Sequence, residues 1–113
     1  MSKVLLVTND FPPTVGGIQS YLRDFVEHLG ADEIAVFAST QDAEAARAHD
    51  AAVGYRVHRW PRRVMLPTPA TAREMARVIA EEGAETVWFG AAAPLGLLAD
   101  AARRAGARRI VAT

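Results

Sequence analysis

The sequence of 113 residues contains no cysteine, and no apolar run in it is long enough to cross a membrane. Without cysteine there are no disulfide bonds and no thiolate metal ligands, which is typical of cytoplasmic proteins. A membrane-spanning helix needs roughly 20 apolar residues in a row, so none is expected. The amino terminus has no signal-peptide cleavage site. The composition therefore predicts a globular cytoplasmic chain, either one small domain or part of one.

Net charge is also lacking, because 13 basic residues balance 13 acidic ones. The charges are unevenly spread, however: most acidic residues precede Tyr55, and ten arginines follow it. Such asymmetry indicates either an anionic partner or only uneven solvation. The histidines have no metal-ligand spacing, so no metal site is expected.

The loop over residues 8–21 is the stretch best suited to ligand binding. It follows an apolar run over residues 4–7 that has the composition of a buried strand. Paired prolines keep the loop extended, and Gly16 and Gly17 then open an amphipathic helix over residues 18–29. Bare amides at a helix N-terminus attract anions, and missing Cβ atoms let a phosphate come close. The alternative is that the glycines only permit a tight turn.

Strand and helix patterns alternate along the rest of the chain. An apolar–polar alternation over residues 55–60 predicts an edge strand, and Thr71 with Glu74 has the form of a capping box. The other expected elements are strands over residues 33–38, 86–90 and 109–112 and helices over residues 42–49, 71–82 and 94–105. This order predicts an α/β fold, a parallel Rossmann-like three-layer sheet of about five strands with helices on both faces.

The loop over residues 8–21 carries no dinucleotide or Walker motif, because it lacks G-x-G-x-x-G and has no Lys-Ser/Thr after its glycines. No nucleophile elbow occurs elsewhere. The loop instead places Asn9, Asp10 and Gln19 near the glycine amides. These groups suit a ligand with hydroxyls beside a phosphate, such as a sugar nucleotide or a sugar phosphate. For Asp10 the alternative is a turn residue that bonds its own backbone.

A second candidate is the segment Arg59–Pro67, in which arginines alternate with apolar side chains. This composition suits an anionic bilayer surface or a phospholipid headgroup, because a guanidinium matches phosphate oxygens in a bidentate manner. The alternative is a solvated loop whose Trp60 and Met65 pack into the core. Nucleic acid is not expected as a partner, since the chain is not basic overall and has no recognisable nucleic-acid module.

Several stretches resemble the start of the retaining glycosyltransferases of family four, which have the two-domain B-type architecture. Within that family the sequence is similar to the actinobacterial phosphatidyl-myo-inositol mannosyltransferases. The matching stretches are Val7–Pro13, Gly16–Tyr21, Val36–Thr40, Arg59–Arg62, Val64–Pro69 and Val87–Leu95. The Pro-Pro-x-x-Gly-Gly pattern alone is moderately specific, whereas the stretches together span nearly the whole chain.

The resemblance implies that the backbone amides of Gly16 and Gly17 bind the diphosphate of GDP-mannose. It also implies that Asn9, Asp10 and Gln19 border the hydroxyls of a phosphoinositide glycolipid acceptor. Contact with the lipid headgroup or with an anionic membrane surface is implied for Arg59, Trp60, Arg62 and Arg63. The resemblance implies neither a metal nor a catalytic residue within these 113 residues.

Enzymes of this family also have a second Rossmann-like domain, which holds most of the nucleotide, and a functional histidine just beyond the strand at residues 109–112. We therefore expect residues 1–113 to form part of the amino-terminal, acceptor-side domain and to be inactive alone. The resemblance further implies a peripheral enzyme at the inner face of the plasma membrane. Two alternatives stay open: a stand-alone phospholipid- or sugar-phosphate-binding module, and a structural fragment without independent function.

Overall fold

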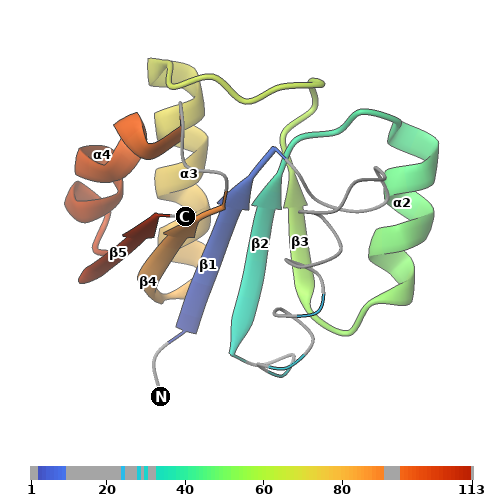
Figure 1. The fold of residues 1–113 in the computed structure, drawn as a ribbon, viewed down its shortest axis with the longest axis horizontal. Coiled ribbons are helices and arrows are strands. Elements are labelled where there is room, and N and C mark those ends of the chain that lie inside the picture. The colour runs from blue at the N-terminus through green and yellow to red at the C-terminus, as the bar shows by residue number, and fades with distance from the viewer. Residues whose placement is uncertain are drawn as a thin grey trace.

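The computed structural model describes residues 3–9, 24, 28, 30, 33–90 and 95–112, which include a five-stranded parallel sheet (Figure 1). Neighbouring strands lie in the order β3-β2-β1-β4-β5. The strands are β1 (Lys3–Thr8), β2 (Ile34–Ala38), β3 (Arg56–Arg59), β4 (Ala84–Phe89) and β5 (Arg109–Ala112). The helices are α2 (Ala43–Ala52), α3 (Pro69–Glu82), the 3₁₀ turn η1 (Leu95–Leu98) and α4 (Ala99–Arg104). The predicted parallel, Rossmann-like α/β fold is confirmed.

Side chains of the central strands point alternately to the two faces of the sheet, as strand geometry requires. Leu5 and Val7 of β1 belong to the apolar cluster on one face, and Leu6 between them belongs to the cluster on the other. All three are fully buried. Burial on both faces explains why this strand has a continuous apolar run. In contrast, β3 pairs with β2 and lies at the edge of the sheet, as its alternating sequence predicted.

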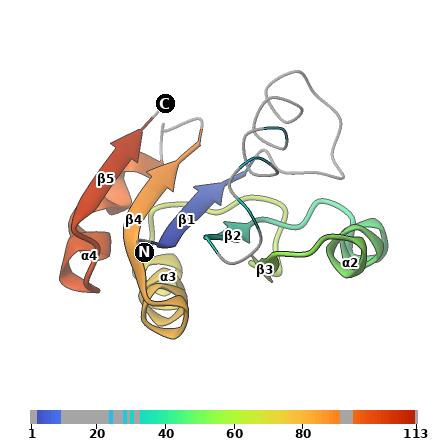
Figure 2. The ribbon, with the colours of Figure 1, turned by 90° about the horizontal axis from the view of Figure 1, so that it is seen from below.

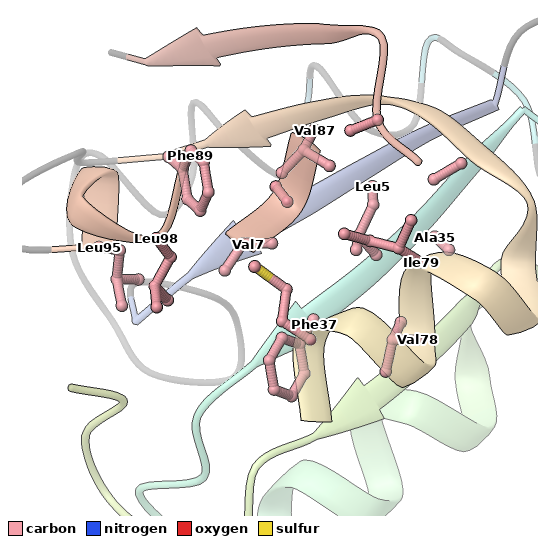
Figure 3. Close-up of a cluster of buried hydrophobic side chains, with 14 of the residues drawn as sticks. Leu5, Val7, Ala35, Phe37, Val78, Ile79, Val87, Phe89, Leu95 and Leu98 are labelled. Atoms are coloured by element: carbon pink, nitrogen blue, oxygen red, sulfur yellow. The ribbon is translucent and has the colours of Figure 1, made fainter. Parts of the chain in front are cut away.

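Helices α3 and α4 lie on the same face of the sheet (Figure 2). Figure 3 shows Ile79 and Val78 of α3 beside Leu5 and Ala35 of the sheet. Met75, Val78 and Ile79 are at most 1% exposed. Burying each such side chain contributes about 1.5–3 kcal/mol, so this apolar face is what holds α3 on the sheet.

Helix α3 begins earlier than the sequence predicted. Thr68 is its N-cap, because the Thr68 Oγ1 accepts from the amide of Thr71 at 3.3 Å. Pro69 takes the first helical position, where its missing N–H removes no intrahelical bond. Thr71 lies buried inside the helix, so the predicted capping box of Thr71 and Glu74 is wrong. The predicted end is confirmed, since Gly83 forms a left-handed C-cap with φ 66°.

Two other predicted helices have different outcomes. The last one is divided, because η1 (Leu95–Leu98) precedes α4. A 3₁₀ turn is common at the start of a helix, and Gly96 within this turn is a poor α-helix former. The helix predicted over residues 18–29 lies outside the described residues, apart from Asp24 and His28, which are helical.

The strand order reverses direction at β1, which positions a binding site. From β1 the chain proceeds outward through β2 to β3, and it then returns through α3 to β4 on the other side of β1. Ligands of open parallel sheets bind beyond the carboxyl ends of the strands, at such a point of reversal. The carboxyl ends of β1 and its neighbours are therefore where a site is expected.

A buried carboxylate joins the end of α3 to the start of β1. Glu82 accepts a hydrogen bond from Lys3 Nζ at 2.6 Å, and its other oxygen lies 2.6 Å from His58 Nε2 and 3.0 Å from Arg56 Nε. Its side chain is 2% exposed. Burial acts to raise the pKa of Glu82, but hydrogen bonds with Lys3 and His58 and the charges of Lys3 and Arg56 outweigh it and lower that pKa.

Replacing Glu82 with Gln should reduce the free energy of unfolding at neutral pH by about 1–3 kcal/mol, because the surrounding cations lose their counter-charge. The folded-state pKa is lowered, so this stabilisation is complete above the unfolded-state pKa and is lost as the pH falls through the folded value. Urea unfolding at neutral pH and below about pH 4 measures both effects.

The matched control for this prediction is Glu81→Gln, which makes the same charge change on an exposed neighbour. Glu81 pairs with Arg56 and Arg77 at the surface, where ion pairs contribute little. Equal destabilisation by the two substitutions at neutral pH would show that Glu82 has no special role.

Candidate functional site

The carboxyl ends of β1, β2 and β3 lie beneath a loop that we call the rim loop, residues 60–68. In Figure 1 the rim loop runs from the end of β3 to the start of α3, over the edge of the sheet to which the arrows of β1, β2 and β3 point. It contains most of the candidate segment Arg59–Pro67. The fold thus brings this segment to the edge where the reversal at β1 predicts a site.

Asn9 directly follows β1 and holds the rim loop through its side chain. Its Nδ2 donates to the carbonyl oxygen of Met65 at 3.1 Å, and its Oδ1 accepts from the amide of Met65 at 2.7 Å. The carboxamide therefore satisfies both backbone polar groups of one loop residue, whose side chain is fully buried. Asn9 is predicted to border the acceptor, and the structure shows that one donor and one acceptor position of its carboxamide are used by Met65.

Gln41 joins the rim loop to the ends of β1 and β2. Its Nε2 lies 3.2 Å from the carbonyl oxygen of Asn9, 3.0 Å from Ser39 Oγ and 2.8 Å from the carbonyl oxygen of Arg63. The two hydrogens of this amide are thus shared among three acceptors. Ser39 Oγ also donates to the carbonyl oxygen of Asn9 at 3.3 Å. Gln41 was not among the predicted site residues, because a single glutamine in a polar stretch gives no sign of which backbone groups it will contact.

Thr40 fixes the first part of the rim loop. Its amide donates to the carbonyl oxygen of Arg62 at 2.9 Å, and its Oγ1 donates to that of Trp60 at 2.9 Å. The Trp60 ring packs edge-on against Phe37, with 6.4 Å between ring centroids. This packing is one of the two core contacts that the solvated-loop interpretation predicted, and the burial of Met65 is the other. The rim loop is therefore well anchored although it has no regular secondary structure.

Four side chains of the rim loop point outward. Arg62 and Arg63 are exposed, and Val64 and Leu66 on either side of the buried Met65 are 51% and 53% exposed. Neither arginine forms an ion pair with a carboxylate in the part of the chain that the structure describes. One short loop thus presents two cations and two apolar side chains to the surroundings, with the core contacts made by other residues.

Arg59, the last residue of β3, has a different environment. Its Nε and Nη2 donate to the two carboxylate oxygens of Asp50 at 3.0 and 2.9 Å, and its Nη1 donates to the carbonyl oxygen of Ser39 at 2.7 Å. The Arg59 side chain is only 14% exposed. Its guanidinium thus connects α2 to the sheet, and its predicted contact with a lipid headgroup stays a prediction. A pocket of about 320 Å³ lies beside this pair, with Arg47 on its wall.

Four predicted site residues, Asp10, Gly16, Gly17 and Gln19, lie outside the described residues, and their roles stay predictions. Within residues 3–9, 33–90 and 95–112, histidine, aspartate and glutamate side chains form no cluster that could hold a metal ion. No helix in these same parts of the chain is long and apolar enough to cross a membrane.

The chain is similar to curated mannosyltransferases. It is 59% identical over 111 residues to the GDP-mannose-dependent monoacylated alpha-(1-6)-phosphatidylinositol monomannoside mannosyltransferase of Corynebacterium glutamicum, covering 98% of the chain and 29% of that protein. It is 57% and 56% identical to the GDP-mannose-dependent alpha-(1-6)-phosphatidylinositol monomannoside mannosyltransferases of Mycolicibacterium smegmatis and Mycobacterium tuberculosis, covering 97% and 100% of the chain and 29% and 30% of those proteins. The chain therefore spans less than a third of the length of these curated relatives, in their amino-terminal part. No protein-family model matches it.

Replacing Arg59 with Gln should reduce the free energy of unfolding by about 1–3 kcal/mol, because Asp50 and the Ser39 carbonyl lose a charged donor in a half-buried place. Urea unfolding measures the loss, and the double variant with Asp50→Asn measures the coupling of the pair. The matched control is Arg62→Gln, which removes an exposed arginine and should change stability by less than about 0.5 kcal/mol. Equal effects of the two arginine substitutions would contradict the structural role of Arg59.

Proposed function

From its homology to the GDP-mannose-dependent phosphatidylinositol monomannoside mannosyltransferases, we propose that this chain is the amino-terminal, acceptor-side part of such an enzyme. The observation that carries the proposal is an identity of 56–59% along 97–100% of the chain. An identity of this size over nearly the whole chain supports both a shared fold and a shared ligand chemistry. The reaction would transfer mannose from GDP-mannose to a phosphatidylinositol mannoside.

The donor and acceptor would meet at the carboxyl ends of β1 and β4. In this proposal the amides of Gly16 and Gly17 bind the diphosphate of the donor. Hydroxyl groups of the glycolipid donate hydrogen bonds to Asp10 and exchange them with Gln19. Asn9 borders the acceptor in this proposal, with one donor and one acceptor position of its carboxamide already used by Met65. The strand order supports this location, since β1 is the strand at which the direction of the fold reverses.

The membrane contact of the enzyme would be made by the outward side chains of the rim loop. Arg62 and Arg63 match the negative charge of lipid phosphates, and the exposed Val64 and Leu66 can enter the headgroup region. The acceptor is a glycolipid in this proposal, so a basic and apolar loop at the edge of the acceptor site would place the enzyme at the bilayer. We infer a peripheral enzyme on the inner face of the plasma membrane, whose leaflet is anionic, with Arg59 and Trp60 anchoring the loop to the sheet.

The full-length enzyme that contains this chain should transfer radiolabelled mannose from GDP-mannose to phosphatidylinositol monomannoside, and the 113-residue chain alone should not. The physical reason is that the chain spans less than a third of its relatives, whose remaining length would complete the donor site. Thin-layer separation of the extracted lipids measures the product. Mannose transfer by the chain alone would contradict the expectation that it needs the rest of the enzyme. Failure of the full-length enzyme with this donor and acceptor would overturn the proposed function.

Replacing both Arg62 and Arg63 with Gln should weaken binding to anionic vesicles by roughly tenfold or more, because each arginine near an anionic surface contributes about 1 kcal/mol. The effect should shrink as salt is added, since the attraction is screened. Vesicle sedimentation at low and high ionic strength measures it.

The matched control for vesicle binding is the double substitution Arg103→Gln and Arg104→Gln on α4. These two arginines are also exposed, and their loss changes the net charge by the same amount. If both double variants bind equally well, the attraction depends on total charge alone, and the rim loop is not the membrane contact.

A further inference from the structure

The outward side chains of the rim loop are adjacent to a buried one, so their direction depends on how the backbone is held. Val64, Met65 and Leu66 are consecutive, yet the first and third are about half exposed and the middle one is fully buried. No helix or strand imposes this alternation on the loop. The hydrogen bonds that hold Met65 in place must therefore also determine where its two neighbours point.

Asn9 makes those hydrogen bonds, and Gln41 holds both Asn9 and the preceding part of the loop. Asn9 binds both backbone groups of Met65, at 3.1 and 2.7 Å. Gln41 binds the carbonyl oxygen of Arg63 at 2.8 Å and the carbonyl oxygen of Asn9 at 3.2 Å. Gln41 thus connects Arg63 of the loop to Asn9, which in turn holds Met65. Both side chains are only partly exposed, and neither belongs to the loop that they fix.

We propose that Asn9 and Gln41 are positioning residues for membrane contact: they hold the rim loop so that Arg62, Arg63, Val64 and Leu66 face the lipid before binding. The inference rests on the proposed membrane contact of the rim loop and adds the residues that prepare it. A loop that is ordered in advance loses little conformational freedom when it binds, whereas a loose loop must be ordered by the membrane itself.

The test uses Gln41→Met, which keeps the length and neutral charge of the side chain and removes its hydrogen bonds. The control is Gly106→Ala, a neutral change between α4 and β5 that is strained because Gly106 has φ +118° while nothing crowds the position. It should lower thermal stability without touching the rim loop. Asn9→Leu serves as a second, stronger variant if its product folds.

Two readouts are taken on each variant: sedimentation with vesicles of phosphatidylcholine and phosphatidylinositol in equal amounts, and hydrogen exchange at the Met65 amide. We expect Gln41→Met to weaken vesicle binding roughly fivefold and to speed exchange at Met65. Gly106→Ala should leave vesicle binding unchanged, even if it lowers the melting temperature as much as Gln41→Met does.

The outcomes separate this inference from the proposed function. If Gln41→Met binds vesicles as the unchanged chain does, while the Arg62 and Arg63 double variant does not bind, the membrane contact stands and the positioning role is refuted. If Gly106→Ala weakens binding equally, the effect is one of general stability and the positioning role is refuted again. If the unchanged chain does not bind these vesicles, the membrane contact and the positioning role both fail, while the mannose-transfer assay still decides the enzymatic proposal.

Discussion

The pairing of one side-chain amide with one backbone unit, Asn9 with Met65, determines the shape of the candidate site. A carboxamide has the same donor and acceptor as a peptide group, so Asn9 offers the rim loop the two bonds that a neighbouring strand would offer. The loop can therefore lie across the strand ends without becoming a strand itself. The Met65 side chain then packs into the apolar cluster on the sheet, and its neighbours Val64 and Leu66 remain exposed for contact with a partner.

The two kinds of arginine near this site show that composition alone does not decide function. Arg59 and Arg62 are three residues apart, yet Arg59 lies in a bidentate pair with Asp50 and Arg62 is exposed. The difference follows from geometry, because Arg59 ends a strand beside α2 whereas Arg62 lies in the loop beyond it. A basic segment can thus contain both structural and binding arginines, and only the fold distinguishes them.

The sequence predicted the sheet well because each strand carries its own signal. The continuous apolar run of β1 reflects burial on both of its faces, and the apolar–polar alternation in β3 reflects burial on one face. Both patterns can be read from a few neighbouring residues. The N-cap of α3 was misplaced because Thr68 and Thr71 are both threonines at helix-start spacing, and only the structure shows which one accepts. The contacts of Gln41 and the Arg59–Asp50 pair could not be predicted, since the partners lie in different elements and are brought together by tertiary packing.

The strand order also has a consequence for the way the chain folds during synthesis. β1 is central, and its two neighbours are made at very different times: Val4 pairs with Ile34 on one side and with Thr86 on the other. One edge of this buried central strand must therefore wait until residues 84–89 have left the ribosome. Pairing over such sequence distances is slow, and an unpaired apolar edge is prone to association. We expect nascent chains that end between β3 and β4 to need protection by chaperones, although β1, β2 and β3 are already complete in them.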